Sequence, residues 1–365
     1  MSGASYAAAG VDVEAGERAV ALMRDAVQRA QRSETRGNFG GFAGAFDASA
    51  LKTYRHPTLV TSTDGVGTKV AVAQAMDVHD TVGIDLVAMV VDDIVVCGAE
   101  PLFMTDYIAT GSVVPERIAA IVSGIAEGCV RAGCALLGGE TAEHPGLLAA
   151  GEYDIAGAGT GVVEADSMLG PERVRAGDVV IAMASSGLHS NGYSLARYIL
   201  LGENGPGLFA HSAELGRSIG EELLEPTRIY ARDCLALIDA VDVHAFSHIT
   251  GGGIAANIAR VLPPDVTAEL DRNTWVPHPV FTLIAGLGAV DGLEMERTFN
   301  MGIGMVAIVA AEDAPRACEV LGAREVTSWV CGELRERMPG EQGDAEAKGG
   351  SGGAVRLSGT YRSGG

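Results

Sequence analysis

The chain has 365 residues and a formal net charge of −21, from 26 Lys and Arg against 47 Asp and Glu. This excess of acid argues against general binding to nucleic acid or to an anionic membrane surface. Hydrophobic residues at 47% and charged residues at 20% fit a packed globular protein with room for two domains. No apolar run predicts a membrane span, and the first ten residues lack the pattern of a signal peptide. Six scattered cysteines favour reduced thiols, so we expect a cytoplasmic protein.

The first predicted element is an amphipathic helix over residues 12–32, where apolar residues from Val20 to Ala30 recur at helical spacing. A loop rich in glycine and phenylalanine follows at 38–46. Such a loop is either a mobile cover over a ligand or a hydrophobic turn. Three phenylalanines among the glycines favour the cover.

The next stretch, Thr61–Lys69, follows a short apolar run and combines a carboxylate, two glycines and an ammonium group. Asp64 can hold Mg²⁺, which prefers oxygen ligands, and Lys69 suits a phosphate. Glycines let the backbone approach a ligand closely. The spacing is not that of a Walker A loop. A tight turn with a surface lysine is the alternative, and the stretch by itself does not decide between the two.

Residues 80–97 are predicted to form a buried helix that carries three carboxylates, Asp85, Asp92 and Asp93. Carboxylates on a buried helix are costly unless they are paired or bind a metal. They are therefore either partners of buried arginines, or caps, or ligands of Mg²⁺. The second interpretation is favoured because Asp64 belongs to a similar cluster.

Three further elements complete the first half: a strand at 102–108, a helix at 115–132 and a strand at 134–137 that runs into Gly138–Thr141. Pro115 suits the first turn of the helix, and a glycine follows its last residue. A strand at 153–163 contains glycines that superficially resemble a dinucleotide fingerprint. No helix follows it, so a Rossmann site is rejected.

The second half begins after a boundary near residues 165–177, where Gly-Pro and Gly-Asp pairs interrupt the pattern. A buried strand at 179–184 runs into Ser186–Asn191 ahead of a predicted helix, an arrangement that suits an anion. His189 in this loop is either a proton carrier or a turn residue. A strand at 243–249 leads to Thr250–Gly253 and another predicted helix, which repeats the arrangement of strand, loop and helix.

The remaining order of elements favours an α+β sandwich over an open Rossmann sheet. A helix is predicted from Thr227 to Val241. Strands are expected near 265–270, 303–310 and 324–332, with helices near 254–262, 279–298 and 312–321. Residues 339–365 are rich in glycine and poor in apolar side chains, so a disordered tail is expected.

These motifs together resemble the phosphoribosylformylglycinamidine cyclo-ligase family, also called aminoimidazole ribonucleotide synthetases. The resemblance runs in order from residue 6 to about residue 335. It is carried by residues 6–12, 40–42, 63–69, 83–89, 98–103, 138–143, 185–195, 226–230, 250–253 and 297–300.

The resemblance implies two α/β domains followed by the tail. The N-terminal domain, 1–168, would bind ATP and pair its sheet with that of a second copy to form a barrel in a homodimer. The C-terminal domain, 169–338, would be an α/β sandwich that binds the substrate.

The resemblance also implies a reaction of purine synthesis. ATP and formylglycinamidine ribonucleotide would give aminoimidazole ribonucleotide, ADP and phosphate through a phosphorylated amide, with Mg²⁺ as a cofactor. Catalytic roles are expected for Asp64, Lys69 and His189, and Mg²⁺ ligation for Asp64, Asp93 and Glu140. The nucleotide would contact Gly40, Gly41, Phe42, Thr63, Lys69, Asp92, Gly138, Gly139 and Thr141. The substrate would contact Ser186, His189, Ser190, Asn191, Thr250, Gly251 and Gly252.

Two positions depart from the family pattern. Asp92 stands where asparagine is usual, which adds a possible negative charge near the expected metal, and Ala43 replaces a usual glycine. Related ATP-dependent enzymes fit less well. A selenophosphate synthetase needs a reactive cysteine near the N-terminus, but the first is Cys97. A hydrogenase-maturation member ends in a functional cysteine, whereas this chain ends in glycine. A thiamine-phosphate kinase lacks the Ser185–Gly192 element.

A non-catalytic nucleotide-binding module belongs to a different functional class. Such a module is expected to have lost acidic and basic residues of the catalytic site. Here, however, the residues Asp64, Lys69, Asp93 and Glu140 are all present.

Overall fold

The computed structural model describes residues 12–37, 40–347 and 349–362 and divides into two compact units. The first unit takes in Met1–Ile94 and Ala99–Asp166, and the second takes in Val95–Gly98 and Ser167–Gly365. The main division lies between Asp166 and Ser167. None of the described helices is long and apolar enough to cross a membrane.

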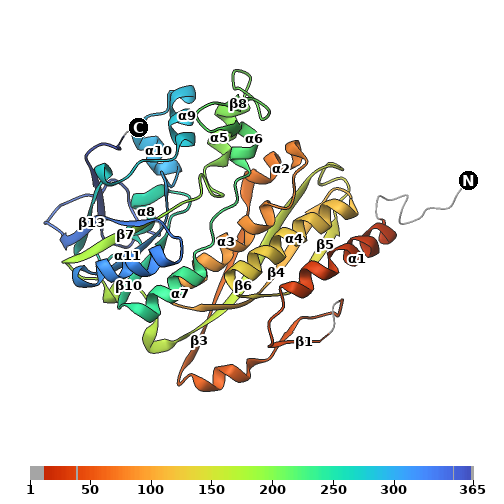
Figure 1. Ribbon diagram of the computed structural model, residues 1–365, viewed down its shortest axis with the longest axis horizontal. Helices are drawn as coiled ribbons and strands as arrows, with labels where there is room; N and C mark the ends of the chain where they lie inside the picture. Colours follow the sequence, from red (N-terminus) through yellow and green to blue (C-terminus); the bar gives the residue numbers. More distant parts are fainter. Residues whose placement is uncertain (1–11, 38–39, 348, 363–365) are drawn as a thin grey trace, which may run out of the picture. The chain divides into compact units, whose positions relative to one another are not determined.

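The first unit is built on a four-stranded sheet in the order β3-β6-β4-β5, in which only β4 and β5 run parallel (Figure 1). Its elements are α1 (Val13–Arg29), β1 (Thr35–Arg36), β2 (Ala45–Phe46), β3 (Pro57–Gly65), α2 (Val70–Met76), α3 (Val82–Val95), β4 (Glu100–Thr110), α4 (Pro115–Ala132), β5 (Ala135–Glu143) and β6 (Tyr153–Glu164). The helices predicted over 12–32, 80–97 and 115–132 are confirmed, each within a few residues of its expected ends.

Local chemistry explains where these helices begin and end. The side chain of Asp12 accepts a hydrogen bond from the backbone N–H of Ala15 and so caps α1. Pro115 lies in the first turn of α4, where its missing N–H costs nothing. Gly133 ends α4 with a left-handed φ of 82°, a conformation that favours glycine.

The glycines of β6 bring α3 onto the sheet. A Cβ atom at Gly159 would lie 2.7 Å from a methyl carbon of Val90, and one at Gly161 would lie 2.5 Å from Ile94. Only glycine at these alternate positions lets the helix approach this closely. The repeated glycines therefore serve helix–sheet packing, which agrees with the rejection of a dinucleotide site.

The other face of this sheet is largely uncovered within the described residues. Alternate side chains of β3 are exposed, and Leu59 and Tyr107 keep 60% and 42% of their surface accessible. The described strands of one chain form an open sheet and no closed barrel.

The second unit is built on a six-stranded sheet in the order β10-β12-β7-β13-β11-β14. Its elements are β7 (Asp178–Ala184), α5 (Tyr193–Leu200), β8 (His211–Ser212), β9 (Arg217–Ser218), α6 (Ile219–Leu223), α7 (Ala231–Ala240), β10 (Val243–His248), α8 (Gly253–Ala259), β11 (Val266–Asp271), α9 (Pro279–Gly288), α10 (Gly292–Thr298), β12 (Ile303–Ala310), α11 (Ala314–Ala323), β13 (Ser328–Glu336) and β14 (Ala354–Ser358). Strand β12 is buried on both faces, as a sheet covered by helices on both sides requires. Helices α7 and α11 pack side by side (Figure 1).

Two helix predictions in this unit need correction. The single helix expected near 279–298 is divided into α9 and α10, because Ala289 adopts a left-handed conformation and Asp291 caps the second helix. The helix expected from Thr227 begins only at Ala231.

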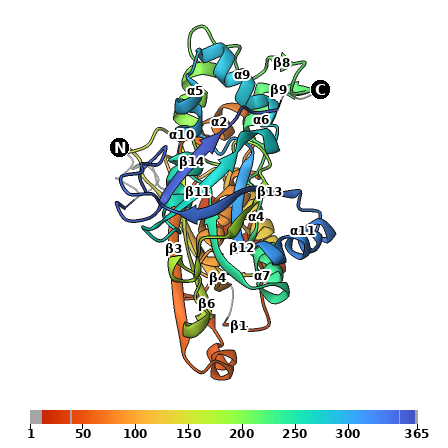
Figure 2. The ribbon, with the colours of Figure 1, turned by 90° about the vertical axis from the view of Figure 1, so that its left-hand side faces the viewer.

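The disorder predicted for 339–365 is wrong for the described part of that segment. Strand β14 pairs in parallel with β11 and extends the sheet by one strand (Figure 2). The carbonyl of Leu357 accepts a hydrogen bond from Arg272, and the Tyr361 ring packs edge-on against Trp275 with centroids 5.2 Å apart. Composition missed this because a short strand needs few apolar residues when it joins an existing sheet edge.

Ending the chain after Met338 should lower the melting temperature by about 5 °C or more, because it removes β14 and the Tyr361 contact and exposes the edge of β11. Thermal unfolding followed by circular dichroism measures the effect. Tyr361→Ala in the full chain should reproduce part of the loss. An unchanged melting temperature in the shortened chain would show that the segment does not stabilise the unit.

Candidate functional site

Asp64 lies inside β3, one residue before its end, rather than in a loop after it. Its Oδ1 accepts a hydrogen bond from the N–H of Gly65 at 2.7 Å. The strand register places Asp64 opposite Gly157, and Gly157 opposite Asp106 on β4. The two carboxylates therefore lie on the same face of the sheet, separated by a glycine. Thr63, the neighbour of Asp64, is exposed on the other face.

Lys69 is fully buried and forms an ion pair with Asp85, with Nζ and Oδ1 2.9 Å apart. Both side chains have 0% of their surface exposed. Asp85 is thus the partner of a buried cation, as the alternative to metal binding expected, but the cation is a lysine and not an arginine. The expectation of an accessible lysine beside a phosphate is not met in this structure, since the ammonium group points to Asp85. Removing either partner would leave an uncompensated buried charge.

The other two carboxylates of α3 differ in accessibility. Asp92, which departs from the family pattern, is fully buried, whereas its neighbour Asp93 is half-buried. Asp93 is therefore the more accessible of the two to a ligand.

The predicted strand-end cluster Gly138–Thr141 is part of β5 itself, which extends to Glu143. Alternation along the strand directs these residues to two faces. Gly139 pairs with Asp106, on the face shared with Asp64, whereas exposed Glu140 pairs with exposed Tyr107 on the opposite face. The side chain of Glu140 accepts a hydrogen bond from the N–H of Thr141 at 3.0 Å.

The expected Mg²⁺ ligands are not gathered into one group within a single chain. Among the described residues, no three His, Cys, Asp or Glu side chains lie together as a metal site. The pairing of β3, β6, β4 and β5 places Asp64 and Glu140 on opposite faces of the sheet. The Mg²⁺ ligands expected from the sequence, Asp64, Asp93 and Glu140, therefore do not fit a single ion within one chain.

The glycine- and phenylalanine-rich loop is only partly described, since Asn38 and Phe39 lie outside the described residues. Gly40 and Gly41 are exposed, and the Phe42 side chain is fully accessible to solvent. The alternative of a packed hydrophobic turn is not supported at Phe42.

Asp106 is a notable residue that the sequence reasoning passed over. It is 9% exposed, and burial raises the pKa of its carboxyl group to about 7. A Cβ atom at Gly139 would clash with this carboxyl group, so glycine is required beside it. A carboxylate inside the otherwise apolar strand 102–108 was the available signal.

Gly139→Ala should destabilise the first unit by roughly 1–3 kcal/mol, because the added methyl group displaces the buried Asp106 carboxyl group. Urea unfolding measures the change. Gly138→Ala is the matched control, since a Cβ at that position meets nothing within 4 Å. Equal effects of both substitutions would contradict the packing argument.

Asp106→Asn should reveal the raised pKa as a dependence of stability on pH. Between about pH 4 and about pH 7, the native carboxyl group keeps a proton that the unfolded chain has lost, so wild-type stability falls as pH rises. An asparagine side chain does not ionise in this range, so the variant does not lose stability in this way. The stability of the variant relative to wild type should therefore increase up to about pH 7 and then level off.

Urea unfolding across this range measures the difference, with exposed Asp154→Asn on β6 as the control. A difference for Asp106→Asn that stays constant with pH would contradict the raised pKa.

In the second unit, the loop after β7 is held by buried polar contacts. The carbonyl of Gly187 accepts hydrogen bonds from Ser185 Oγ at 3.0 Å and from Asn300 Nδ2 at 2.9 Å. Asn300 Oδ1 also accepts the N–H of Gly302 at 2.8 Å. Asn300, one of the residues that carry the family resemblance, thus fixes the shape of the loop.

His189 is buried within this loop and has a left-handed φ of 63°. Its Nε2 accepts a hydrogen bond from the N–H of Ser186 at 3.1 Å. Gly304 provides the space, because a Cβ there would clash with both His189 and Tyr230. The contacts favour a loop-shaping role for His189, and proton transfer by this residue stays a prediction.

The two loops expected to bind substrate are brought together. Asn191 Oδ1 accepts the N–H of Gly251 at 3.0 Å, which joins 185–192 to 250–253. Asn257 steadies the second loop by donating to the carbonyl of Gly253 at 2.8 Å. The Ser190 hydroxyl oxygen is buried and has no hydrogen-bond partner among the described residues.

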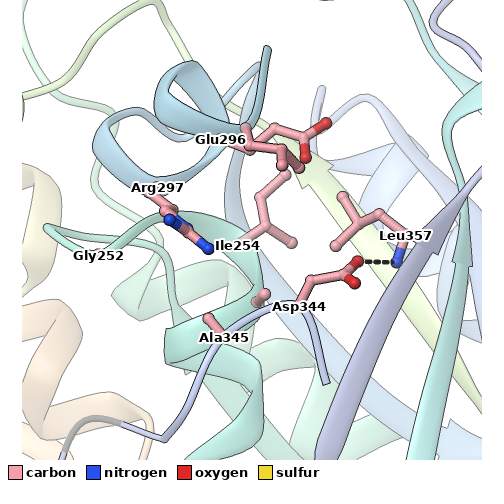
Figure 3. Close-up of a pocket in the computed structure, with 9 residues that line it drawn as sticks. Gly252, Ile254, Glu296, Arg297, Asp344, Ala345 and Leu357 are labelled. Atoms are coloured by element: carbon pink, nitrogen blue, oxygen red, sulfur yellow. Dashed lines mark hydrogen bonds between the residues drawn. The ribbon is translucent and has the colours of Figure 1, made fainter. Parts of the chain in front are cut away.

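A small cavity of about 10 Å³ adjoins Gly252 and lies between α8, α10 and the C-terminal segment (Figure 3). Asp344 contributes to its wall and accepts the N–H of Leu357 at 2.7 Å. This volume holds about one water molecule, so the cavity is no ligand site by itself.

Comparison with known proteins identifies the family. Residues 46–163 match the N-terminal domain of AIR synthase related proteins, and residues 175–340 match the C-terminal domain. The phosphoribosylformylglycinamidine cyclo-ligase of Brevibacillus brevis is 50% identical over 331 residues, covering 91% of this chain and 95% of the relative. The chain belongs to the phosphoribosylformylglycinamidine cyclo-ligase family of enzymes. The member from Myxococcus xanthus is 50% identical over 345 residues, covering 94% of this chain and 99% of its own length.

Solved structures of more distant proteins share the fold. A thiamine-monophosphate kinase from Stenotrophomonas maltophilia superposes with a TM-score of 0.63 at 17% identity, covering 92% of this chain and 95% of its own. E. coli HypE gives a TM-score of 0.63 at 19% identity, covering 95% of this chain and 94% of its own. At these identities the likeness concerns the fold alone.

Proposed function

We propose that this enzyme converts formylglycinamidine ribonucleotide and ATP into aminoimidazole ribonucleotide, ADP and phosphate, as a step of purine biosynthesis. The observation that carries the proposal is the 50% identity to named cyclo-ligases along nearly the whole chain. The joined loops of the second unit and the buried Ser190 hydroxyl support a ligand site there.

The reaction proceeds in two chemical steps. The formyl oxygen of the substrate first takes the terminal phosphoryl group of ATP, which turns a poor leaving group into a good one. The amidine nitrogen then attacks the formyl carbon, forms the C–N bond of the imidazole ring and loses a proton as phosphate departs. Such a transfer depends mainly on positioning and electrostatic stabilisation.

The residues divide between the two units. ATP is assigned to the first unit, with Asp64, Asp93 and the glycines of β5 as contacts; a HypE structure in complex with ATP supports nucleotide binding by this fold. Lys69 acts through its ion pair with Asp85, which fixes the segment that follows Asp64. The ribose phosphate is assigned to the loops 186–191 and 250–252.

Mg²⁺ enters this proposal only as the ion that accompanies ATP. The described carboxylates form no assembled metal group, so no step is assigned to the ion. His189 is retained as a candidate for proton transfer, although its contacts favour support of the loop.

We further propose that the enzyme is a cytoplasmic homodimer. The open face of the first-unit sheet, with exposed Leu59 and Tyr107, offers a surface for a second copy. Pairing through this face would bring Glu140, which lies on it, toward the partner.

A coupled assay for ADP with formylglycinamidine ribonucleotide, with and without Mg²⁺, tests the proposal. ADP formation should require the substrate and the ion. Asp64→Asn should reduce turnover at least about 100-fold while leaving the melting temperature nearly unchanged, because it removes a charge from the proposed nucleotide site. Absence of substrate-dependent ADP formation in the wild type would refute the activity, and an active variant would remove Asp64 from its role.

A further inference from the structure

A cavity of about 320 Å³ opens inside the second unit beside the first residue of the proposed substrate loop. It is lined by Ser186, Glu214, Leu215, Gly216, Arg217, Glu222, His278 and Pro279. Apart from Ser186, these residues belong to none of the motifs that predicted the site. The lining is mainly polar and lies next to the loop that holds His189 and Asn191.

Glu222, on α6, is the most unusual group in this cavity. Its side chain is only 8% exposed. Oε2 accepts a hydrogen bond from Arg217 Nε at 2.7 Å, whereas Oε1 accepts no hydrogen bond from any described residue. Oε1 lies beneath the substrate loop, 3.7 Å from where a Cβ atom of Gly187 would be. Because Glu222 lines the cavity and Oε1 is not engaged by Arg217, this carboxylate oxygen can accept a hydrogen bond from a ligand in the cavity.

The other polar groups of the cavity are already engaged. Arg217 is held by two carboxylates, since it also bonds Glu225 at 2.6 Å. Ser186 Oγ donates to the carbonyl of Pro226 at 2.7 Å and accepts the N–H of Arg228 at 3.1 Å. The hydrogen-bonding capacity that remains in the cavity is therefore mainly that of an acceptor.

His278 adds to this acceptor character. Its Nε2 lies 2.9 Å from the carbonyl of Ser185, so Nε2 carries the proton and donates it. In the neutral ring Nδ1 is then an acceptor. With Glu222 Oε1, the cavity favours a ligand group that donates N–H or O–H hydrogen bonds.

We propose that Glu222 is a substrate-binding residue whose Oε1 accepts a hydrogen bond from the ribonucleotide substrate. The inference rests on the proposed function, because it assigns the donor to that substrate. The phosphate is placed at the Asn191 and Gly251 end of the loop, and the cavity lies at the Ser186 end. The donor is either a ribose hydroxyl or the amidine group, which share the same hydrogen-bonding chemistry.

Steady-state kinetics of Glu222→Gln tests the assignment. The KM for formylglycinamidine ribonucleotide should rise about tenfold or more, with the KM for ATP unchanged, because a charged acceptor is lost from the substrate site alone. Glu225→Gln is the matched control. It removes the same charge from the same Arg217 but does not line the cavity, so its substrate KM should stay near that of the wild type.

A substrate KM for Glu222→Gln equal to that of the wild type, or an equal rise in the two variants, would overturn the proposal. Glu222→Asp covers the case in which the first variant fails to fold, since it keeps the charge beside Arg217 but withdraws the carboxylate from the cavity. It should also raise the substrate KM.

Two probes identify the donor group and separate this inference from the proposed function. Calorimetry with ribose 5-phosphate supplies the hydroxyls without an amidine, and acetamidine supplies the amidine without a sugar. Weaker binding of either probe to Glu222→Gln than to the wild type assigns that group as the donor. If the wild type turned over no substrate, the proposed function would fail. The affinities of the wild type and of Glu222→Gln for ribose 5-phosphate would still decide whether Glu222 Oε1 contacts a sugar phosphate. Equal affinities of the two proteins would then overturn the inference.

Discussion

The close approach of α3 to β6 is the constraint on which the first unit depends. Glycines at alternate positions of β6 allow Val90 and Ile94 to pack directly on the strand. Asp85 on the same helix is completely buried, and a buried carboxylate makes a cationic partner necessary. Lys69 supplies it, and the ion pair fixes the segment between β3 and α2 next to Asp64. The packing of α3 on the strand explains the glycine pattern of β6, and the buried carboxylate of Asp85 explains why Lys69 is buried beside it.

A comparable use of glycine shapes the second unit. The absence of a side chain at Gly304 leaves space for His189 and Tyr230 beneath the loop that follows β7. Asn300 then holds this loop through its hydrogen bond to the carbonyl of Gly187, and Asn191 joins the loop to Gly251. The site loops are consequently rigid features of the sheet edge, in the sense that their shape is set by buried hydrogen bonds.

Three buried carboxyl groups show three ways to manage the cost of burying a charge. Asp85 is neutralised by an ion pair, whereas Asp106 has its pKa raised by burial and keeps its proton to higher pH. Glu222 is paired through one oxygen only. The third leaves an acceptor directed at a cavity, which is why burial alone does not distinguish structural carboxylates from functional ones.

Hydrophobic periodicity, caps and glycine-rich motifs are local signals, so they were sufficient to predict most of the helices and strands and the family. Tertiary structure decided what each side chain meets. The partner of Lys69, the opposite faces of Asp64 and Glu140, and the pairing of β14 with β11 all depend on strand register or on residues distant in the chain. Glu222 gave no sequence signal, since its two oxygens become different only when Arg217 and the cavity are placed around them.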